Sequence, residues 1–130
     1  MAGELILIVE DNEKNRKLER DILQFHGYRT AEADTAEEGI RLAQATPPAL
    51  VLMDIQLPGM NGIEALHELR ADPPTRAIPV IAVTASVMTQ DRQKIMAAGF
   101  DGYQPKPIEV TQFVAAVRNT VDHPTVGDRP

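Results

Sequence analysis

At 130 residues the chain is long enough for one domain with a buried core, and its 43% of hydrophobic residues is typical of a globular protein. The absence of cysteine excludes disulfides, zinc–thiolate sites and thiol catalysis. A net charge of −6 argues against a nucleic-acid backbone as partner, because phosphate contacts need clustered lysine and arginine. No apolar run has the length of a membrane span or the form of a signal sequence. We therefore expect a cytoplasmic protein with protein partners and no membrane insertion.

The amino-terminal part of the chain predicts a strand followed by a helix. Leu5–Val9 is a continuous apolar run, as in a strand that is buried on both faces. Leu18, Ile22 and Phe25 then recur at helical spacing, with charged residues between them. This pattern predicts an amphipathic helix over residues 13–26, whose charged residues form its solvated face.

The rest of the chain repeats this alternation. Strands are predicted over residues 28–33, 49–53, 78–83 and 101–104, and helices after Thr35, after Asn61 and over residues 86–98 and 109–121. The first of these strands carries small or polar side chains, as suits an edge strand, and helix 86–98 lacks a strong apolar stripe. The last helix places five apolar residues on one face: Val110, Phe113, Val114, Val117 and Val121.

The alternation of strands and helices predicts the fold class. Five strands alternating with five helices indicate an α/β domain with a doubly wound parallel sheet that is covered by helices on both faces. We expect this domain to occupy residues 1–122. Residues 123–130 are polar and contain proline, which predicts a disordered tail.

Four of the predicted strands end in polar residues that are suited to chemistry. Glu10-Asp11 follows the first strand, Asp54 the third, Thr84 the fourth and Lys106 the fifth. Because the carboxyl ends of parallel strands gather at one edge, where ligands bind, we expect these side chains to lie together. Three carboxylates, a hydroxyl and an ammonium suit a divalent cation and a phosphoryl group.

Each acid also has a purely structural interpretation. Glu10, Asp11 and Asn12 are residues that cap helices, and Asp54 is of a type that forms turns. If the first and third strands are neighbours, however, Asp11 and Asp54 are crowded together, and crowded carboxylates recruit a cation. Oxygen ligands without His or Cys favour Mg²⁺, for which Mn²⁺ can substitute.

Asp54 is the candidate nucleophile of this site. A carboxylate can accept a phosphoryl group as an acyl phosphate. Thr84 would supply a hydroxyl, and Lys106 a compact positive charge, to stabilise the transferred group. Pro107 allows a cis peptide bond that aims Lys106 into the site.

Together these motifs resemble the receiver domains of two-component response regulators, the CheY-like family. The resemblance covers about residues 4–121. Within the family, the chain looks most like the single-domain DivK-type regulators and the receiver segments of hybrid histidine kinases. The matching stretches are Ile8-Val9-Glu10-Asp11-Asn12, Leu52-Met53-Asp54-Ile55-Gln56-Leu57-Pro58-Gly59-Met60-Asn61-Gly62, Pro79-Val80-Ile81-Ala82-Val83-Thr84-Ala85 and Lys106-Pro107.

The resemblance implies a flavodoxin-like sheet in the strand order 2-1-3-4-5 and a set of residue roles. The implied site residues are Asp54 as phosphoacceptor; Glu10, Asp11, Asp54 and the backbone carbonyl of Gln56 as Mg²⁺ ligands; and Thr84, Lys106 and the Ala85 backbone as phosphoryl contacts. Tyr103 matches the switch aromatic of the family, which moves into the space that Thr84 leaves after phosphorylation. By general statistics, Tyr103 is equally well a half-buried tyrosine of an edge strand.

The implied function is signalling, without turnover of an external substrate. A histidine kinase or a histidine phosphotransfer protein would donate the phosphoryl group. A surface made of helix 86–98, strand 101–104 and helix 109–121 would then bind a downstream effector protein. A phosphate shuttle to a phosphotransfer protein and a receiver that signals by binding alone are the alternatives, and we expect a monomer or a weak dimer.

Two other classes that share this architecture are excluded by particular residues. A nucleotide or flavin site needs a glycine-rich first turn, whereas the acidic turn at residues 10–13 would repel a phosphate. An aspartyl-phosphate hydrolase needs a second acid two residues after the nucleophile, and this chain has Gln56 there.

Overall fold

The computed structural model describes residues 3–85 and 89–122. Two predictions lie outside the described residues: the start of the helix predicted from residue 86, and the disordered tail over residues 123–130. Within the described ranges, five strands and five helices alternate along the chain.

Each element that the sequence predicts is present in the structure. The strands are β1 (Leu5–Val9), β2 (Arg29–Ala33), β3 (Leu50–Asp54), β4 (Val80–Thr84) and β5 (Gly102–Pro105). The helices are α1 (Glu13–Phe25), α2 (Ala36–Ala45), α3 (Gly62–Ala71), α4 (Thr89–Ala97) and α5 (Val110–Asp122). None of these described helices is long and apolar enough to cross a membrane.

The strands form a single parallel sheet in the order β2-β1-β3-β4-β5, as the family resemblance implies. The three continuous apolar runs are the central strands β1, β3 and β4, because a strand covered on both faces has no polar face. β2 and β5, which carry more polar residues, lie at the two edges. The order confirms that the first and third strands are neighbours.

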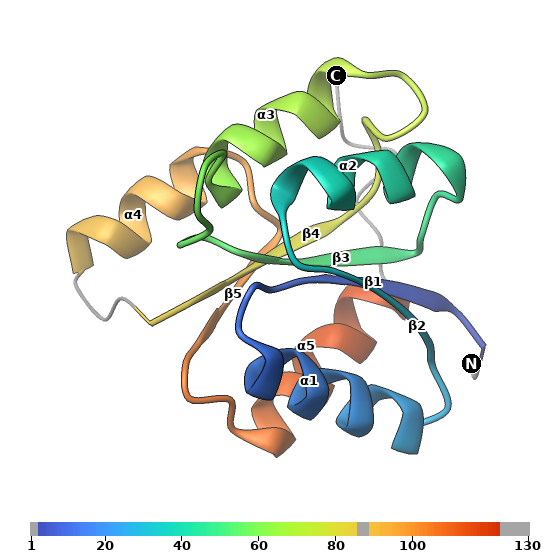
Figure 1. Ribbon diagram of the computed structural model, residues 1–130. Coiled ribbons are helices and arrows are strands. Elements are labelled where there is room, and N and C mark those ends of the chain that lie inside the picture. The colour runs from blue at the N-terminus through green and yellow to red at the C-terminus, as the bar shows by residue number, and fades with distance from the viewer. Residues whose placement is uncertain (1–2, 86–88, 123–130) are drawn as a thin grey trace.

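The helices form two layers, one on each face of the sheet (Figure 1). α1 and α5 cover one face, and their core includes Ile8, Leu23 and Phe113. α2, α3 and α4 cover the other face, and their core includes Leu66 and Ile95. Each face of the sheet therefore closes its own hydrophobic core.

The buried face of α1 differs from the prediction. Leu18 and Phe25 are exposed, Phe25 by 86%, whereas Glu19, Ile22 and Leu23 are buried. Successive residues of a helix turn by about 100°, so that Glu19, Ile22 and Leu23 form one stripe and Leu18 and Phe25 fall outside it. The prediction that the charged residues of α1 are solvated is wrong at Glu19.

Side-chain caps fix where α1, α2 and α3 begin. Asn12, Thr35 and Asn61 each accept a backbone N–H from the first turn of the helix that follows. The cap of α3 is reciprocal, because Glu64 also accepts the N–H of Asn61 at 3.0 Å. The cap at Asn61 starts α3 soon after β3, and thus close to the end of that strand.

The apolar face of α5 is only partly buried. Phe113, Val114 and Val117 are buried, as the pattern predicts, and Val121 is half-buried. Val110 is exposed, contrary to the prediction. It is the first residue of the helix, where the core no longer covers the side chain.

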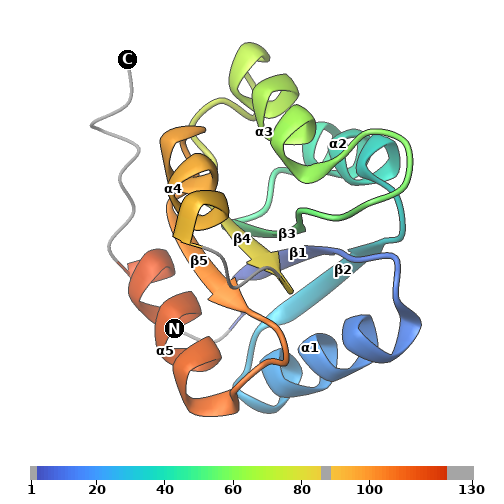
Figure 2. The same cartoon turned by 90° about the vertical axis from the view of Figure 1, so that its left-hand side faces the viewer.

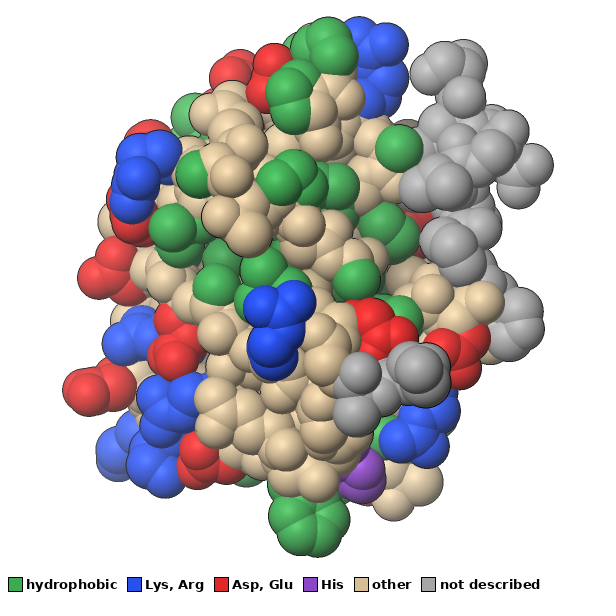
Figure 3. Space-filling model, turned by 90° about the vertical axis from the view of Figure 1, so that its right-hand side faces the viewer, with side chains coloured by type: hydrophobic (Ala, Val, Ile, Leu, Met, Phe, Trp, Pro, Cys, Tyr) green, Lys and Arg blue, Asp and Glu red, His purple; other side chains and the backbone are tan. Residues whose placement is uncertain are grey.

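An apolar patch lies at the amino edge of the sheet (Figure 3). Hydrophobic side chains gather over the upper half of this view of the molecule. A groove of about 340 Å³ at this edge is lined by Pro48, Ala49, Pro73, Pro74, Ala77, Ile78, Pro79 and Val121. The opposite, carboxyl edge holds the charged residues that the sequence singles out.

Candidate functional site

The predicted functional residues lie at the carboxyl edge of the sheet, which faces the viewer in Figure 2. Glu10 follows β1 directly, Asp54 ends β3 and Thr84 ends β4. Lys106 follows β5, and its backbone N–H donates to the Thr84 carbonyl at 2.8 Å. The parallel sheet thus brings together residues that are far apart in the sequence.

Three acids converge at this edge. Carboxylate oxygens of Glu10, Asp11 and Asp54 lie within 4.8 Å of one another. Glu10 and Asp54 are only 1% and 2% exposed, whereas Asp11 is open to solvent. The register explains the convergence, since Val9 pairs with Met53 and the acids are the next residues along both strands.

Lys106 provides a positive charge inside this cluster. Its Nζ atom lies 2.9 Å from Oε1 of Glu10 and 3.2 Å from Oδ2 of Asp54. The Lys106–Pro107 peptide bond is cis. Lys106 therefore bridges one acid that follows β1 and another that ends β3.

Burial and charge together shift the pKa values in the cluster. Burial raises the pKa of Glu10 to about 7. The hydrogen bond from Lys106 opposes this rise, and the negative charge of Asp54 adds to it. Burial by itself lowers the pKa of Lys106, but the bond to Glu10 and the charges of Asp54 and Glu10 outweigh it and raise that pKa. Because one lysine cannot neutralise three acids, the cluster suits a divalent cation with oxygen ligands.

The loop after β3 fixes the orientation of Asp54. The N–H of Gln56 donates to Oδ1 of Asp54 at 3.0 Å, while Oδ2 faces Lys106. Gly62 packs against this loop, and its N–H donates to the Ile55 carbonyl at 3.1 Å. A Cβ atom at Gly62 would lie 2.6 Å from the Asp54 carbonyl oxygen and 2.9 Å from the Ile55 Cα. Only glycine permits this approach of α3 to the end of β3.

Thr84 is buried at the end of β4, beside a small cavity. The cavity has a volume of about 210 Å³ and is lined by Thr84, Ile55, Gln56, Ile63, Asp91, Lys94 and Ile95. Ala85, whose backbone is a predicted phosphoryl contact, follows Thr84 and is exposed. The end of β4, α3 and α4 thus surround an unfilled space beside Thr84.

Tyr103 lies on β5, outside the acidic cluster. In the register it pairs with Ala82, two residues before Thr84. Its ring packs against the core under α2, α3 and α4, and the guanidinium of Arg92 lies 5.4 Å from the ring centroid. Tyr103 is therefore half-buried and in contact with α4, and its switch role stays a prediction.

Glu19 is a buried acid near this site that the sequence patterns did not identify. The side chain is 1% exposed, and burial raises its pKa to about 8, with the charge of Glu10 adding to the shift and that of Lys106 opposing it. The sequence contains a pattern that could have identified Glu19 as buried. A buried stripe through Ile22 and Leu23 includes Glu19, which lies one helical turn earlier on the same face.

Arg16 also touches the site without having been predicted. Its Nη1 donates to the backbone carbonyl of Glu10 at 2.9 Å, and its Nε lies 3.3 Å from Oε1 of Glu32 on β2. Nothing in the sequence distinguishes Arg16 from the other cations of α1, because the contact depends on the orientation of α1 relative to the end of β1.

The arrangement as a whole defines a class of protein. A five-stranded parallel sheet in this order, with an acidic cluster and a lysine at its carboxyl edge, is the architecture of CheY-like proteins. Residues 6–118 match the response regulator receiver domain family, and the chain belongs to this family.

Known relatives agree with this assignment. The chain is 43% identical over 114 residues to the polar-differentiation response regulator DivK of Brucella ovis, which covers 88% of this chain and 93% of the relative. The solved receiver domain of the sensor histidine kinase PA1611 from Pseudomonas aeruginosa PAO1 has a magnesium ion coordinated in its active site cleft. It is 31% identical with a TM-score of 0.87, covering 94% of this chain and 100% of that one. A CheY-like receiver domain protein from Methanospirillum hungatei JF-1 gives 30% identity and a TM-score of 0.83, covering 93% of this chain and 95% of that one.

Proposed function

We propose that this receiver domain accepts a phosphoryl group from a phosphohistidine onto Asp54, with the help of Mg²⁺, and thereby changes its contacts with other proteins. The observation that carries the proposal is the position of Lys106, 2.9 Å from Glu10 and 3.2 Å from Asp54. A buried carboxylate beside a fixed cation and two further acids is the set of groups that phosphoryl transfer to an acid needs.

The proposed metal site consists of oxygen ligands. Glu10, Asp11, Asp54 and the backbone carbonyl of Gln56 would hold Mg²⁺, and Mn²⁺ would substitute for it. The convergence of the three carboxylates within 4.8 Å supports this set. When bound, the ion neutralises negative charge on the phosphoryl oxygens.

In the proposed reaction, a carboxylate oxygen of Asp54 attacks the phosphorus atom. The new O–P bond forms as the N–P bond of the phosphohistidine breaks, and the histidine nitrogen keeps the electron pair and takes up a proton. Lys106, the Thr84 hydroxyl and the Ala85 backbone N–H stabilise the phosphoryl oxygens. Water later cleaves the acyl phosphate, which releases phosphate and restores Asp54. No external substrate is turned over.

Phosphorylation would act on the surface formed by α4, β5 and α5. The new group brings roughly −2 charge, and Thr84 would turn toward it. Tyr103 would then move into the space that Thr84 leaves. Two features of α4 support this: it borders the cavity at Thr84, and its exposed residue Met96 shows that its apolar residues do not all face the core. An element with little packing can shift between two positions.

The proposed partners are proteins. A histidine kinase or a histidine phosphotransfer protein would donate the phosphoryl group, and a downstream effector would bind the α4–β5–α5 surface. We place the reaction in the cytoplasm, as the sequence predicts, with the receiver as a monomer or a weak dimer. A phosphate shuttle would use the same acceptor chemistry and then return the group to a phosphotransfer histidine.

Intact-mass spectrometry tests the acceptor chemistry. The protein is incubated with Mg²⁺ and acetyl phosphate, and wild type should gain the mass of one phosphoryl group. Asp54→Asn should gain none, because an amide is a poor nucleophile. Asp34→Asn is the matched control, since Asp34 follows β2 at the same edge of the sheet and is exposed. It should be phosphorylated like wild type.

Two results would contradict the proposal. The first is an adduct that persists in Asp54→Asn or in the presence of EDTA. The second is the absence of both an adduct and a stable beryllofluoride complex in wild type, which would favour a receiver that signals by binding alone. Transfer of the phosphoryl group from this protein to an added phosphotransfer protein would identify a phosphate shuttle.

A further inference from the structure

We propose that Arg16 is a positioning residue of the metal site, which holds the peptide group between Glu10 and Asp11 in place and is itself oriented by Glu32. The inference rests on the proposed function of the site and adds Arg16 and Glu32, which lie outside the matching stretches quoted above. It is carried by two contacts of the Arg16 guanidinium, one to the end of β1 and one to β2.

The first contact fixes a single peptide plane. Nη1 of Arg16 donates to the backbone carbonyl of Glu10 at 2.9 Å. This carbonyl belongs to the same planar peptide group as the N–H of Asp11. The other side of Glu10 is held as well, since its N–H donates to the Ala33 carbonyl at 3.0 Å. The backbone that carries both acids is therefore fixed from α1 and from β2.

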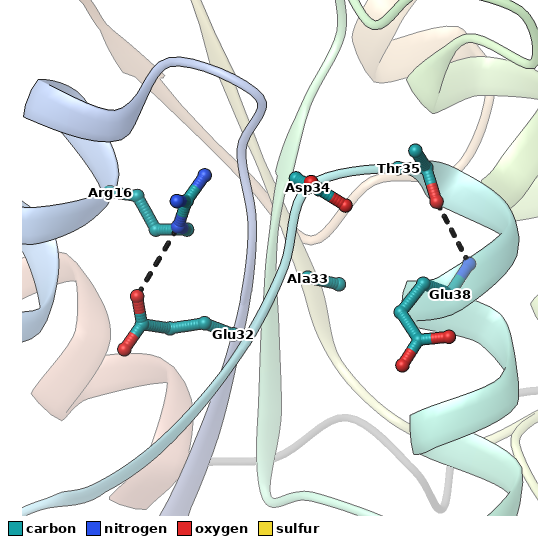
Figure 4. A pocket seen from close by; sticks show the side chains of 6 residues that line it. All are labelled: Arg16, Glu32, Ala33, Asp34, Thr35 and Glu38. Carbon is teal, nitrogen blue, oxygen red and sulfur yellow. Dashed lines mark hydrogen bonds and ion pairs between the residues drawn. The ribbon is translucent and has the colours of Figure 1, made fainter.

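The second contact keeps Arg16 in this position. Figure 4 shows Arg16 of α1 and Glu32 of β2 pointing toward each other at one side of a pocket, with Asp34, Thr35 and Glu38 on the other side. Nε of Arg16 lies 3.3 Å from Oε1 of Glu32. A guanidinium is planar, so an ion pair at Nε restricts the direction in which Nη1 donates.

The charge of Arg16 also acts on the acidic cluster. The guanidinium is held at the end of β1, where three carboxylates converge, and its positive charge, partly offset by Glu32, by itself opposes the binding of a further cation. Weaker Mg²⁺ binding after loss of Arg16 would therefore come from lost positioning and not from lost charge. Lys106 approaches Glu10 through its side chain, whereas Arg16 approaches through the backbone, so that Arg16 leaves the carboxylate oxygens available for Mg²⁺.

Arg20 provides a matched comparison within the same helix. Its Nη1 lies 3.3 Å from Oε2 of Glu32, so that it shares the acidic partner of Arg16. Its other contact is to Asp21, on the outer side of α1. Substituting Arg20 therefore removes a cation and an ion pair with Glu32 but leaves the hydrogen bond to Glu10 intact.

Titration with Mg²⁺ alone, followed by the amide NMR signals of the residues around Asp54, tests the proposal. Arg16→Gln should raise the dissociation constant for Mg²⁺ about tenfold, as is typical when a group that orients a metal ligand is lost. Arg20→Gln should change the dissociation constant less than about twofold, because this half-buried ion pair does not contact the backbone of Glu10. Glu32→Gln should weaken Mg²⁺ binding in the same direction as Arg16→Gln, by about threefold, because Arg16 remains but is no longer held.

Stability measurements separate positioning from a merely structural role. Arg16→Gln and Arg20→Gln should have similar urea midpoints, and only Arg16→Gln should bind Mg²⁺ more weakly. Equal Mg²⁺ affinities of these two variants would overturn the inference and leave the proposed function standing. If wild type itself shows no saturable response to Mg²⁺, the proposed function fails first. If Arg16→Gln does not fold, the Mg²⁺ affinity of Glu32→Gln becomes the test. A dissociation constant equal to that of wild type would then overturn the proposal.

Discussion

The half-buried Lys106 and the buried Glu10 form an ion pair across the carboxyl edge of the sheet, with 2.9 Å between Nζ and Oε1. The pair joins the turn after β5 to the end of β1. Glu10 is also a proposed Mg²⁺ ligand, so that the lysine and the ion attract the same carboxylate. The pair therefore couples the lysine that is proposed to contact the phosphoryl group to the acids that would bind the metal.

This coupling predicts how Lys106→Met responds to Mg²⁺. Without metal, the variant should lose about 3 kcal/mol of unfolding free energy, because Glu10 and Asp54 are then buried without their cation. Added Mg²⁺ should raise the urea midpoint more in Lys106→Met than in wild type, since the released carboxylates bind the ion more tightly. Urea unfolding in EDTA and in Mg²⁺ measures both effects.

A lysine on the surface serves as the control for this prediction. Lys17→Met removes an exposed ion pair with Asp21 and should change either quantity by less than about 0.5 kcal/mol. A smaller stabilisation by Mg²⁺ in Lys106→Met than in wild type would show that the lysine and the ion do not compete for Glu10.

The sequence predicted the fold and the convergence of the site because both follow from the same rule. In a parallel sheet, polar residues placed directly after buried apolar runs must lie at one edge, and the register puts Asp54 beside the end of β1. Asp54 and Thr84 are the last residues of their strands, which fixes their positions once the strand order is known.

Contacts that depend on the rotation of a helix were not predictable in this way. The pattern of Leu18, Ile22 and Phe25 fits an amphipathic helix equally well, yet the structure buries Glu19 and leaves Phe25 in solvent. A rotation of one residue position, about 100°, separates the two solutions, and the observed one buries Leu23 fully. The approach of Arg16 to the Glu10 carbonyl depends on this rotation as well.

Glu19 should make the stability of the protein fall as the pH rises. Folding raises the pKa of this carboxyl from 4.5 to about 8, so that the folded state holds a proton that the unfolded state has released. The stability from this proton is fully present below about pH 4.5 and is lost as the pH rises through 8. In Glu19→Gln this loss is absent, because the amide does not titrate.

Urea unfolding at several pH values in EDTA measures the effect. Relative to wild type, Glu19→Gln should gain on the order of 3 kcal/mol between about pH 5 and pH 9. Comparing the two proteins cancels the titration of the groups that do not interact with Glu19. Glu68→Gln, at an exposed position of α3, should show no such trend. Parallel pH profiles of Glu19→Gln and wild type would mean that Glu19 is charged in the folded protein.

Gly62→Ala should disturb Asp54 through its backbone. The new Cβ would lie 2.6 Å from the Asp54 carbonyl oxygen, so that either α3 or the loop after β3 must move. We expect a loss of about 1–3 kcal/mol in unfolding free energy and a slower reaction with acetyl phosphate. Gly102→Ala is the control, because the three atoms nearest to its Cβ would all belong to the side chain of Ile81, the closest at 3.3 Å. Phosphorylation of Gly62→Ala at the wild-type rate would show that the close approach of α3 does not matter for the acceptor.

The chain contains two tyrosines, which allows a direct test of the proposed switch. Tyr103 contacts Arg92 of α4, whereas Tyr28 is buried in the core of α1 and α5 on the other face of the sheet. Beryllofluoride, which imitates the phosphoryl group on an aspartate, should shift the NMR signals of the Tyr103 ring and leave those of Tyr28 nearly unchanged. Arg92→Ala should alter the Tyr103 signals before beryllofluoride is added, because the cation above the ring is lost. If the amide of Asp54 reports bound beryllofluoride while the ring of Tyr103 does not respond, Tyr103 is only a half-buried residue of an edge strand, and the signal must leave the site by another path.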